Sequence, residues 1–136
     1  MSAGLIVVPH LVRAVDGWVD AEWVWNPADP LAVWLVMSPG DRRGPRRWAF
    51  GVELLAAGLA ATVECPAGLG DVRLHVDPTG DRLVIDLSNG RESVRCWADR
   101  WAADRFCRRV VVPEGLPETV ARQIDAAVTW CLGGVR

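Results

Sequence analysis

Apolar and polar residues alternate along two stretches in the middle of the chain, residues 72–77 and residues 82–87. Successive side chains of a strand point to opposite faces of a sheet, so each stretch predicts a strand with one buried face. His75 falls on the polar face of the first stretch. Turn sequences follow both stretches, at residues 77–80 and 88–90. With residues 92–96 added after the second turn, this pattern predicts a three-stranded meander.

The first quarter of the chain predicts a pair of strands. Residues 5–15 and 18–25 are rich in β-branched and aromatic side chains, and the turn signal Asp16-Gly17 lies between them. In the second stretch, alternation places Trp23 and Trp25 on one face and Trp18 on the other.

Two further strands are expected after this pair. Residues 31–37 form an unbroken apolar run of strand length, which indicates a strand covered on both faces. Residues 38–47 are polar and contain Pro39-Gly40, a turn signal. We therefore expect residues 46–50 to return as a strand beside residues 31–37.

A helix is predicted to follow and to lie at the centre of the fold. Phe50, Leu54 and Leu55 recur at helical spacing, and Glu53 is the only charged residue nearby. A helix that is apolar on nearly every side must be covered by other elements, so we expect a central buried helix with sheet around it. It should end near Gly58, with residues 60–69 as a flexible linker into the meander.

Two amphipathic helices are predicted to close the chain. The first begins at Trp97 and extends to about Val110, with apolar side chains on one stripe and charged ones on the other. The second begins near Pro117 and stops near Gly133. The fold class expected is α+β, with antiparallel sheets, a central buried helix and two C-terminal amphipathic helices in a single domain, residues 1–136.

Composition limits where the protein is expected in the cell and which partners it is expected to bind. Half of the residues are hydrophobic, but there is no apolar run of the ~18 residues that a membrane-spanning helix needs. Residues 1–8 lack the basic start of a signal peptide, so we expect a cytoplasmic protein. The formal net charge of −2 provides no overall field that favours nucleic acid.

No catalytic, cofactor-binding or metal-binding site is predicted, so we do not expect an enzyme. The four cysteines are scattered without a Cys-x-x-Cys pair, and neither histidine is near a cysteine in sequence. They are expected to be free thiols. His75 has no serine or cysteine neighbour that would suggest a nucleophile pair, and a solvated strand histidine is expected instead. Gly68-Leu69-Gly70-Asp71 lacks the spacing of a phosphate-binding loop.

Aromatic and arginine residues supply the candidate contact sites. Eight tryptophans exceed what one small core needs, so some are expected at a surface. We expect Trp18, Trp23 and Trp25 at the interface of an oligomer. The four arginines Arg42, Arg43, Arg46 and Arg47 crowd one loop, where two alternatives stay open: a solvated hairpin tip, or a dock for an acidic protein partner.

Motifs spread over most of the chain resemble those of the SsgA-like family of sporulation and cell-division proteins from spore-forming actinobacteria. Residues 26–33 resemble the family's Asp-Pro-x-Ala-Val entry to the third strand. Residues 48–59 are similar to its Trp-x-Phe-Ala-Arg-Asp-Leu-Leu-x-x-Gly helix, although Gly51-Val52-Glu53 stands in place of Ala-Arg-Asp. Residues 68–74 resemble its Gly-x-Gly-Asp-Val-x-Val strand, and several shorter motifs follow in the family's order.

The resemblance implies a non-enzymatic protein with a fold similar to the whirly-type RNA-binding proteins, assembled as a trimer. It also implies a role in septation, because one family member brings the tubulin-like protein FtsZ to future septum sites. The expected partners are therefore further copies of the chain and FtsZ or another division protein, at division septa.

A whirly-like module that binds single-stranded nucleic acid is the alternative, because tryptophans can stack on bases. The near-neutral charge argues against it, since phosphate contacts dominate such affinity.

Overall fold

All strands that the structure describes belong to one antiparallel sheet. The computed structural model describes residues 4–42 and 44–110. The strands lie in the order β4-β3-β2-β1-β7-β6-β5. In chain order the elements are β1 (Ile6–Ala14), β2 (Gly17–Trp25), β3 (Ala32–Ser38), β4 (Arg46–Gly51), α1 (Val52–Leu59), β5 (Val72–Val76), β6 (Arg82–Ser88), β7 (Ser93–Asp99) and α2 (Arg100–Arg109). The expected α+β class, the early strands and the three-stranded meander are confirmed.

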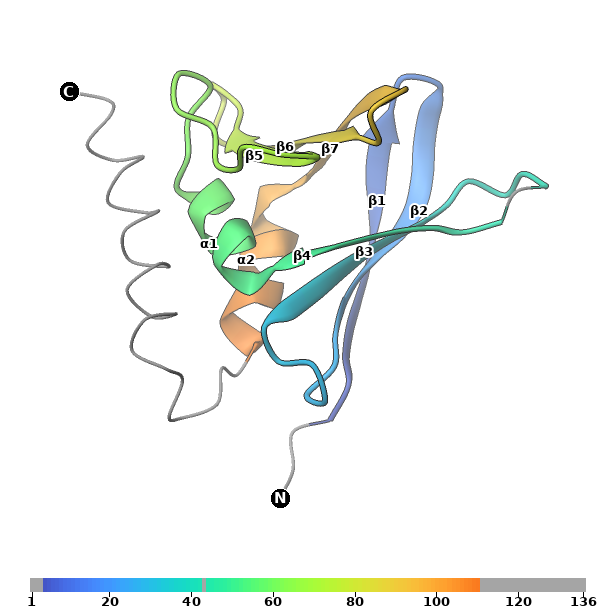
Figure 1. Cartoon of the computed structure of the whole chain (residues 1–136), viewed down its shortest axis with the longest axis vertical. Helices are drawn as coiled ribbons and strands as arrows, with labels where there is room; N and C mark the ends of the chain where they lie inside the picture. The colour runs from blue at the N-terminus through green and yellow to red at the C-terminus, as the bar shows by residue number, and fades with distance from the viewer. Residues whose placement is uncertain (1–3, 43, 111–136) are drawn as a thin grey trace.

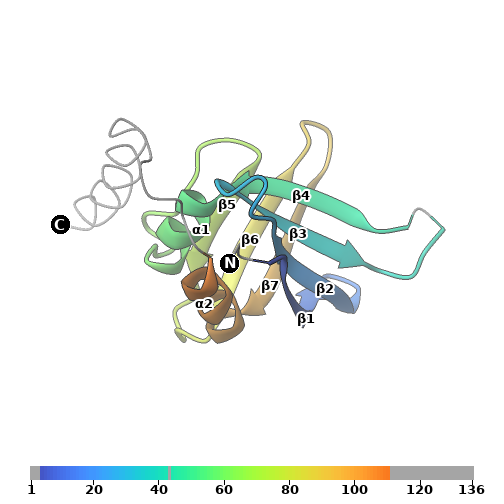
Figure 2. The ribbon, with the colours of Figure 1, turned by 90° about the horizontal axis from the view of Figure 1, so that it is seen from below.

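The sheet bends where its two halves meet. β1 pairs with β2 along its whole length, but with β7 only at Val12–Ala98 and Arg13–Trp97. This short junction separates a first limb, β1–β4, from a second limb, β5–β7. Figures 1 and 2 show the limbs curving around α1 and α2, so that the sheet is nearly closed. We call the face toward the helices the inner face and the opposite one the outer face.

An aromatic cluster fills the space between the first limb and α2. Trp23 on β2 stacks on His10 of β1 at 5.4 Å between ring centroids and on Phe106 of α2 at 5.9 Å. Phe50, at the end of β4, meets the Trp23 ring edge-on at 6.1 Å. Such aromatic pairs contribute about 0.5–1.5 kcal/mol beyond the area that they bury. This cluster therefore connects α2 to three strands of the first limb, β1, β2 and β4.

Helix α1 packs against the second limb through its smallest residue. A Cβ atom at Gly58 would lie 2.4 Å from Cβ of Leu74 on β5, so only glycine allows the helix to approach this closely. Leu55 is fully buried, whereas Leu54 is only half-buried. The prediction of a helix here is confirmed; Val52, Leu55, Ala57 and Gly58 are buried, and its other four residues are only partly exposed.

The prediction that a helix begins at Trp97 is wrong. Trp97 and Ala98 extend β7, because they pair with β6 and also form the junction to β1. The helix begins at Arg100, after Asp99, whose carboxylate accepts hydrogen bonds from the backbone N–H groups of Trp101 and Ala102. This N-cap stabilises the start of α2 by about 1 kcal/mol. Helical spacing from Trp97 onward did not reveal that Trp97, Ala98 and Asp99 still pair with β6 as part of a strand.

The linker expected at residues 60–69 is ordered against β5, contrary to the prediction. Ala67 exchanges backbone hydrogen bonds of 2.8 and 2.9 Å with Leu74, and the Val76 N–H donates to Ala61 O at 3.0 Å. Ala61, Cys65 and Ala67 are buried. This segment lies along the edge of β5, which would otherwise expose its backbone.

His75 is buried rather than solvated, which corrects a second expectation for this region. It exposes only 5% of its surface although it lies on the outer face of β5. Burial is the main cause that lowers the pKa of His75, and its Nδ1 has no hydrogen-bond partner in the described part of the chain. Neutral imidazole is therefore the form that the fold favours.

The second C-terminal amphipathic helix, predicted from Pro117 to Gly133, lies outside the described residues. In the part of the chain that the structure describes, no helix is long and apolar enough to cross a membrane. The likeness to whirly-type proteins stays a prediction.

Candidate partner-binding surface

The predicted arginine loop lies in the hairpin that joins β3 to β4, which Figure 1 shows projecting from the body of the molecule. Gly40 and Gly44 both have positive φ angles, 79° and 73°, which other residues rarely adopt. The Gly44 N–H donates to Asp41 O at 3.2 Å. These two glycines therefore allow the hairpin to turn tightly at Asp41 and return as β4.

The structure distributes the arginines instead of gathering them in one patch. Arg46 faces the inner side of β4 and forms a 2.8 Å ion pair with Asp41. Arg47, the next residue of the strand, is exposed on the outer side and forms no ion pair with any described residue. Arg42 is exposed at the tip, and Arg43 lies outside the described residues. Alternation along β4 separates Arg46 from Arg47.

The tryptophans of β2 also divide between the two faces, as their alternation predicted. Trp23 and Trp25 expose 0% and 1% of their surfaces, because they belong to the chain's own core. Trp25 Nε1 donates to Pro30 O at 3.1 Å, whereas Trp23 Nε1 has no hydrogen-bond partner among the described residues. Direct contact of these two side chains with another chain is incompatible with this burial, which corrects their assignment to an oligomer interface. Trp18 is 61% exposed and stays available for one.

One hollow brings a predicted tryptophan and a predicted arginine together. It has a volume of about 430 Å³ and lies where the β1–β2 turn, the β3–β4 hairpin and β7 meet. Trp18, Arg46, Asp41 and Asp16 line it together with the apolar side chains of Met37 and Val94. A lining that combines apolar side chains with charged ones is typical of protein interfaces, where a buried centre is surrounded by a polar rim.

The outer face of the first limb carries a second hollow that sequence reasoning missed. Cross-strand pairing places Val7, Val24, Trp34 and Ala49 in one row across four strands. Val7, Val24 and Trp34 of this row line a hollow of about 430 Å³, and Arg47 and Glu22 line it as well. The run at residues 31–37 predicted a strand covered on both faces, but β3 alternates, with Trp34 36% exposed. The missed signal is the apolar residues of β1, β2 and β3 in one register.

The described histidines and thiols are structural rather than catalytic in their surroundings. Burial is the main cause that lowers the pKa of His10, whose ring stacks on Trp23. Burial raises the pKa of the Cys96 thiol to about 12, so this sulfur stays protonated and unreactive at neutral pH. Cys65, Cys96 and Cys107 are free, as predicted, and Cys131 lies outside the described residues. No group of three metal-ligating side chains occurs in the part of the chain that the structure describes.

Comparison with known proteins matches most of this domain to one family. The family described as "Streptomyces sporulation and cell division protein, SsgA" matches residues 19–116. A sporulation-specific cell division protein of Frankia casuarinae is 41% identical over 64 residues, which are 47% of this chain and 40% of that relative. The matched region thus spans less than half of the relative's length.

Two solved structures share the fold. The SsgA-like sporulation-specific cell division protein of Thermobifida fusca has a TM-score of 0.70 and 26% identity, over 96% of this chain and 98% of that one. A structure from a study of SsgB mutations that correlate to longitudinal cell division during sporulation of Streptomyces coelicolor has a TM-score of 0.65 and 27% identity, over 81% and 90% of the two chains. This protein belongs to the SsgA family of sporulation and cell division proteins.

Proposed function

We propose that this chain acts in sporulation-linked cell division as a non-enzymatic protein that works through protein contacts. Its role in this proposal is the control of septum sites, with FtsZ or a protein that recruits FtsZ as the partner. The family match over residues 19–116 is the observation that carries the proposal. The relatives from Frankia and Thermobifida are both described as sporulation-specific cell division proteins.

The hollow around Trp18 and Arg46 supports a contact function. Tryptophan and arginine are the side chains most often found at the energetic centres of interfaces, and a truncation there commonly costs about 2 kcal/mol or more. Trp18 is 61% exposed, although its large apolar ring gains from burial. The exposed Arg42 at the hairpin tip adds a positive charge that fits an acidic partner.

Capture of FtsZ by the purified full chain tests the proposal. We expect immobilised protein to retain purified FtsZ, and Trp18→Ser or Arg42→Glu to weaken that retention about tenfold or more, as the loss of a central contact predicts. Arg105→Glu on α2 is the matched charge control and should retain FtsZ. Failure to capture either FtsZ or another division protein from sporulating cells contradicts the proposed role. A salt-sensitive shift of a labelled oligonucleotide at micromolar protein would favour the nucleic-acid alternative.

Self-association is part of this proposal. We expect three chains to assemble, with Trp18 rather than Trp23 or Trp25 at the contact. Light scattering after size exclusion should give about three times the 14.9 kDa chain mass, and Trp18→Ser should lower it. A monomer mass at micromolar concentration contradicts the assembly.

We also expect the protein in the cytoplasm, concentrated at division septa. A fluorescent fusion in sporulating cells should form ladders that coincide with septa, whereas a uniform signal contradicts this localisation.

A further inference from the structure

The two edges of the sheet differ in how their backbone groups are satisfied. At the β5 edge, Leu74 and Val76 are hydrogen-bonded to Ala67 and Ala61 of the preceding segment. At the β4 edge, no described strand or segment pairs with the side away from β3. An open edge presents unpaired N–H and C=O groups that can template an added strand. β4 has no proline or bulge between Arg46 and Gly51 that would prevent this.

The hydrogen-bonding register identifies the backbone groups that face the open side. The Val52 N–H donates to Leu31 O at 2.9 Å, one step beyond the Ala32–Gly51 pair. In an antiparallel ladder, hydrogen-bonded pairs alternate with non-hydrogen-bonded pairs. The hydrogen-bonded pairs are therefore Val33–Phe50, Leu35–Trp48 and Met37–Arg46. Arg47 and Ala49 direct their N–H and C=O groups away from β3, and neither has another partner among the described residues.

The surroundings limit the open stretch to its middle. The Glu53 carboxylate folds back onto Gly51, where a Cβ atom would collide with it. At the other end of β4 the preceding residue in the same register is Pro45, which has no N–H. Arg47 and Ala49 are both exposed, and together they present two donors and two acceptors. An added strand can thus exchange about four backbone hydrogen bonds with β4.

We propose that this edge takes an extended, acidic segment of a partner protein as an added antiparallel strand. Backbone hydrogen bonds to Arg47 and Ala49 hold the strand, and a carboxylate on its outer face pairs with the Arg47 guanidinium. Strand addition is an established mode of peptide recognition, in which the main chain supplies affinity and side chains supply specificity. The inference rests on the proposed function only in that the partner is a protein.

Charge favours an acidic segment over a second copy of β4. Arg47 and Arg42 are exposed and form no ion pair with described residues, whereas Arg46 is neutralised by Asp41. A two-fold β4–β4 pair centred on Trp48 would place two Arg47 side chains diagonally on one face, about 7–8 Å apart. Like charges so placed are destabilising, and a carboxylate removes this repulsion.

Binding of a defined peptide to the full chain tests the proposal. The probe is a capped, fluorescent peptide of sequence Thr-Val-Glu-Val-Glu-Val-Thr, and its control carries lysine in place of both glutamates. We expect the acidic peptide to bind at least tenfold more tightly than the lysine peptide in fluorescence anisotropy. Arg47→Glu should reverse this preference. Equal binding of both peptides, or of neither, overturns the proposal.

A proline variant separates strand addition from side-chain docking. Ala49→Pro removes an outward N–H without removing a hydrogen bond to β3, so the fold should persist while peptide affinity falls at least tenfold. Ala49→Val keeps the N–H and should bind as the parent does. Undiminished peptide binding by a folded Ala49→Pro variant overturns the proposal.

Hydrogen exchange on the unsubstituted chain gives a second, independent readout. Addition of the acidic peptide should protect the N–H groups of Arg47 and Ala49 by tenfold or more, while the Trp48 N–H is already protected by β3. No added protection at both positions overturns strand addition. A doubled mass in light scattering that Ala49→Pro abolishes would identify a second copy as the occupant and overturn the acidic segment. FtsZ capture that survives Ala49→Pro leaves the proposed function intact while this inference fails.

Discussion

The outer faces of the two limbs come from similar strands yet have opposite character. On the second limb, cross-strand neighbours Arg73, Asp86 and Arg95 form a charged row. On the first limb, the corresponding row is Val7, Val24, Trp34 and Ala49, and it is apolar. The charged row needs no cover, because its groups are hydrated or paired. The apolar row is partly exposed, so the first limb carries the apolar surface suited to partners.

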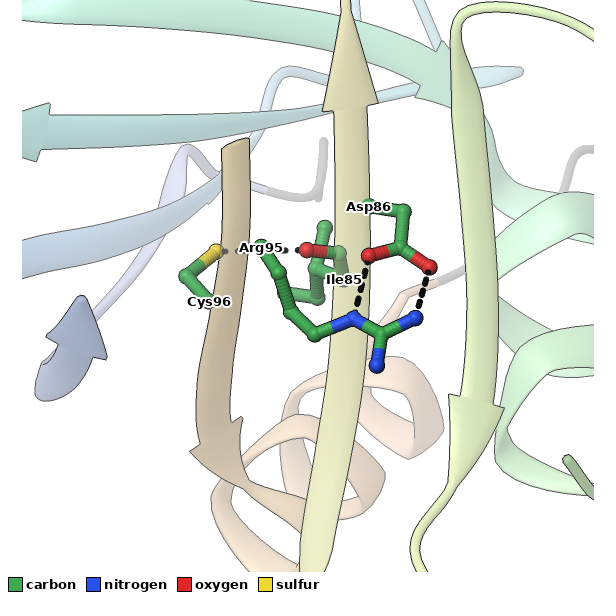
Figure 3. A network of polar contacts seen from close by, with 4 residues as sticks. All are labelled: Ile85, Asp86, Arg95 and Cys96. Atoms are coloured by element: carbon green, nitrogen blue, oxygen red, sulfur yellow. Dashed lines mark hydrogen bonds and ion pairs between the residues drawn. The ribbon is translucent and has the colours of Figure 1, made fainter. Parts of the chain in front are cut away.

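Figure 3 shows the ion pair within the charged row. Arg95 on β7 donates from Nε and Nη2 to the two carboxylate oxygens of Asp86 on β6, at 2.7 and 3.1 Å. The same figure shows Cys96, the next residue, on the opposite side of its strand, where its thiol lies 3.7 Å from Ile85 O. Alternation therefore separates the hydrated outer face from the core within one residue. The first limb has the same alternation, but one of its outer rows, Val7, Val24, Trp34 and Ala49, is apolar.

The largest loss of stability is expected from a substitution on the inner face of the first limb. Trp23→Ala removes the ring that joins His10, Phe50 and Phe106, and we expect it to lower the free energy of unfolding by about 3–5 kcal/mol. That is a large share of the ~5–15 kcal/mol typical of a domain. Asp20→Ala, at an exposed position on the outer face of the same strand, is the control and should change stability by less than about 0.5 kcal/mol. Chemical denaturation followed by circular dichroism measures both, and equal effects would contradict the assigned faces.

A substitution at the contact between the second limb and α1 should also lower stability. Gly58→Val places a side chain against Leu74 Cβ, so helix and strand must separate, and overpacking of this kind costs about 1–3 kcal/mol. Gly70→Ala is the control, because a Cβ at Gly70 meets no atom within 4 Å. Thermal unfolding should show a clear fall in melting temperature for the first variant and almost none for the second. A Gly58→Val protein as stable as the parent would refute the close approach.

The stability of the protein is expected to depend on pH through the histidines of the two limbs. The folded-state pKa values of His10 and His75 are lowered by burial below the unfolded value of about 6.5. Above that pH both states are neutral. As pH falls through 6.5 the unfolded state binds more protons, so stability decreases, by at most about 1.4 kcal/mol per pH unit for each histidine.

Denaturation at pH 7.5 and pH 5.5 measures this slope. His10→Gln should flatten it by removing the proton-linked group from the aromatic cluster, and His75→Gln should do the same for the second limb. Stability that rises on acidification between these pH values would contradict the sign.

The smallest expected effect concerns the charged row itself. The Asp86–Arg95 pair is 34% and 53% exposed, so Arg95→Ala should cost only about 0.2–1 kcal/mol, and less at 1 M salt because exposed charges are screened. Arg73→Ala on the same face removes a charge without an ion pair and should be neutral. A loss above 2 kcal/mol for Arg95→Ala would show that this row supports the fold more than its exposure indicates.

Local patterns predicted most elements but not where they end. Alternation at residues 72–77 and 82–87 located β5 and β6, and turn chemistry located the hairpins. Helical spacing misplaced the start of α2 by three residues, because Trp97, Ala98 and Asp99 pair with β6 as the end of β7. His75 was misjudged because alternation assigns a face and says nothing about how deeply that face is covered.

The candidate site was predicted by residue type and corrected by burial. Arg42, Arg46 and Arg47 lie in the predicted hairpin, but the alternation of β4 separates Arg46 from Arg47. Trp18 remains at a surface, whereas Trp23 and Trp25 are core residues. The number of tryptophans in the sequence indicated contact sites. Only the packing of α2 against the first limb determines which of these tryptophans are covered.

By itself, the sequence determined the α+β class, the antiparallel hairpins and the membership of the SsgA family, because these depend on local patterns and on motifs in order. Tertiary structure alone decided the bend between the limbs, the cover over β5 and the open edge of β4. These features depend on pairing between residues far apart in the chain, such as Val12 with Ala98. Side-chain periodicity carries no information about which distant strand supplies the partner, so it could not predict them.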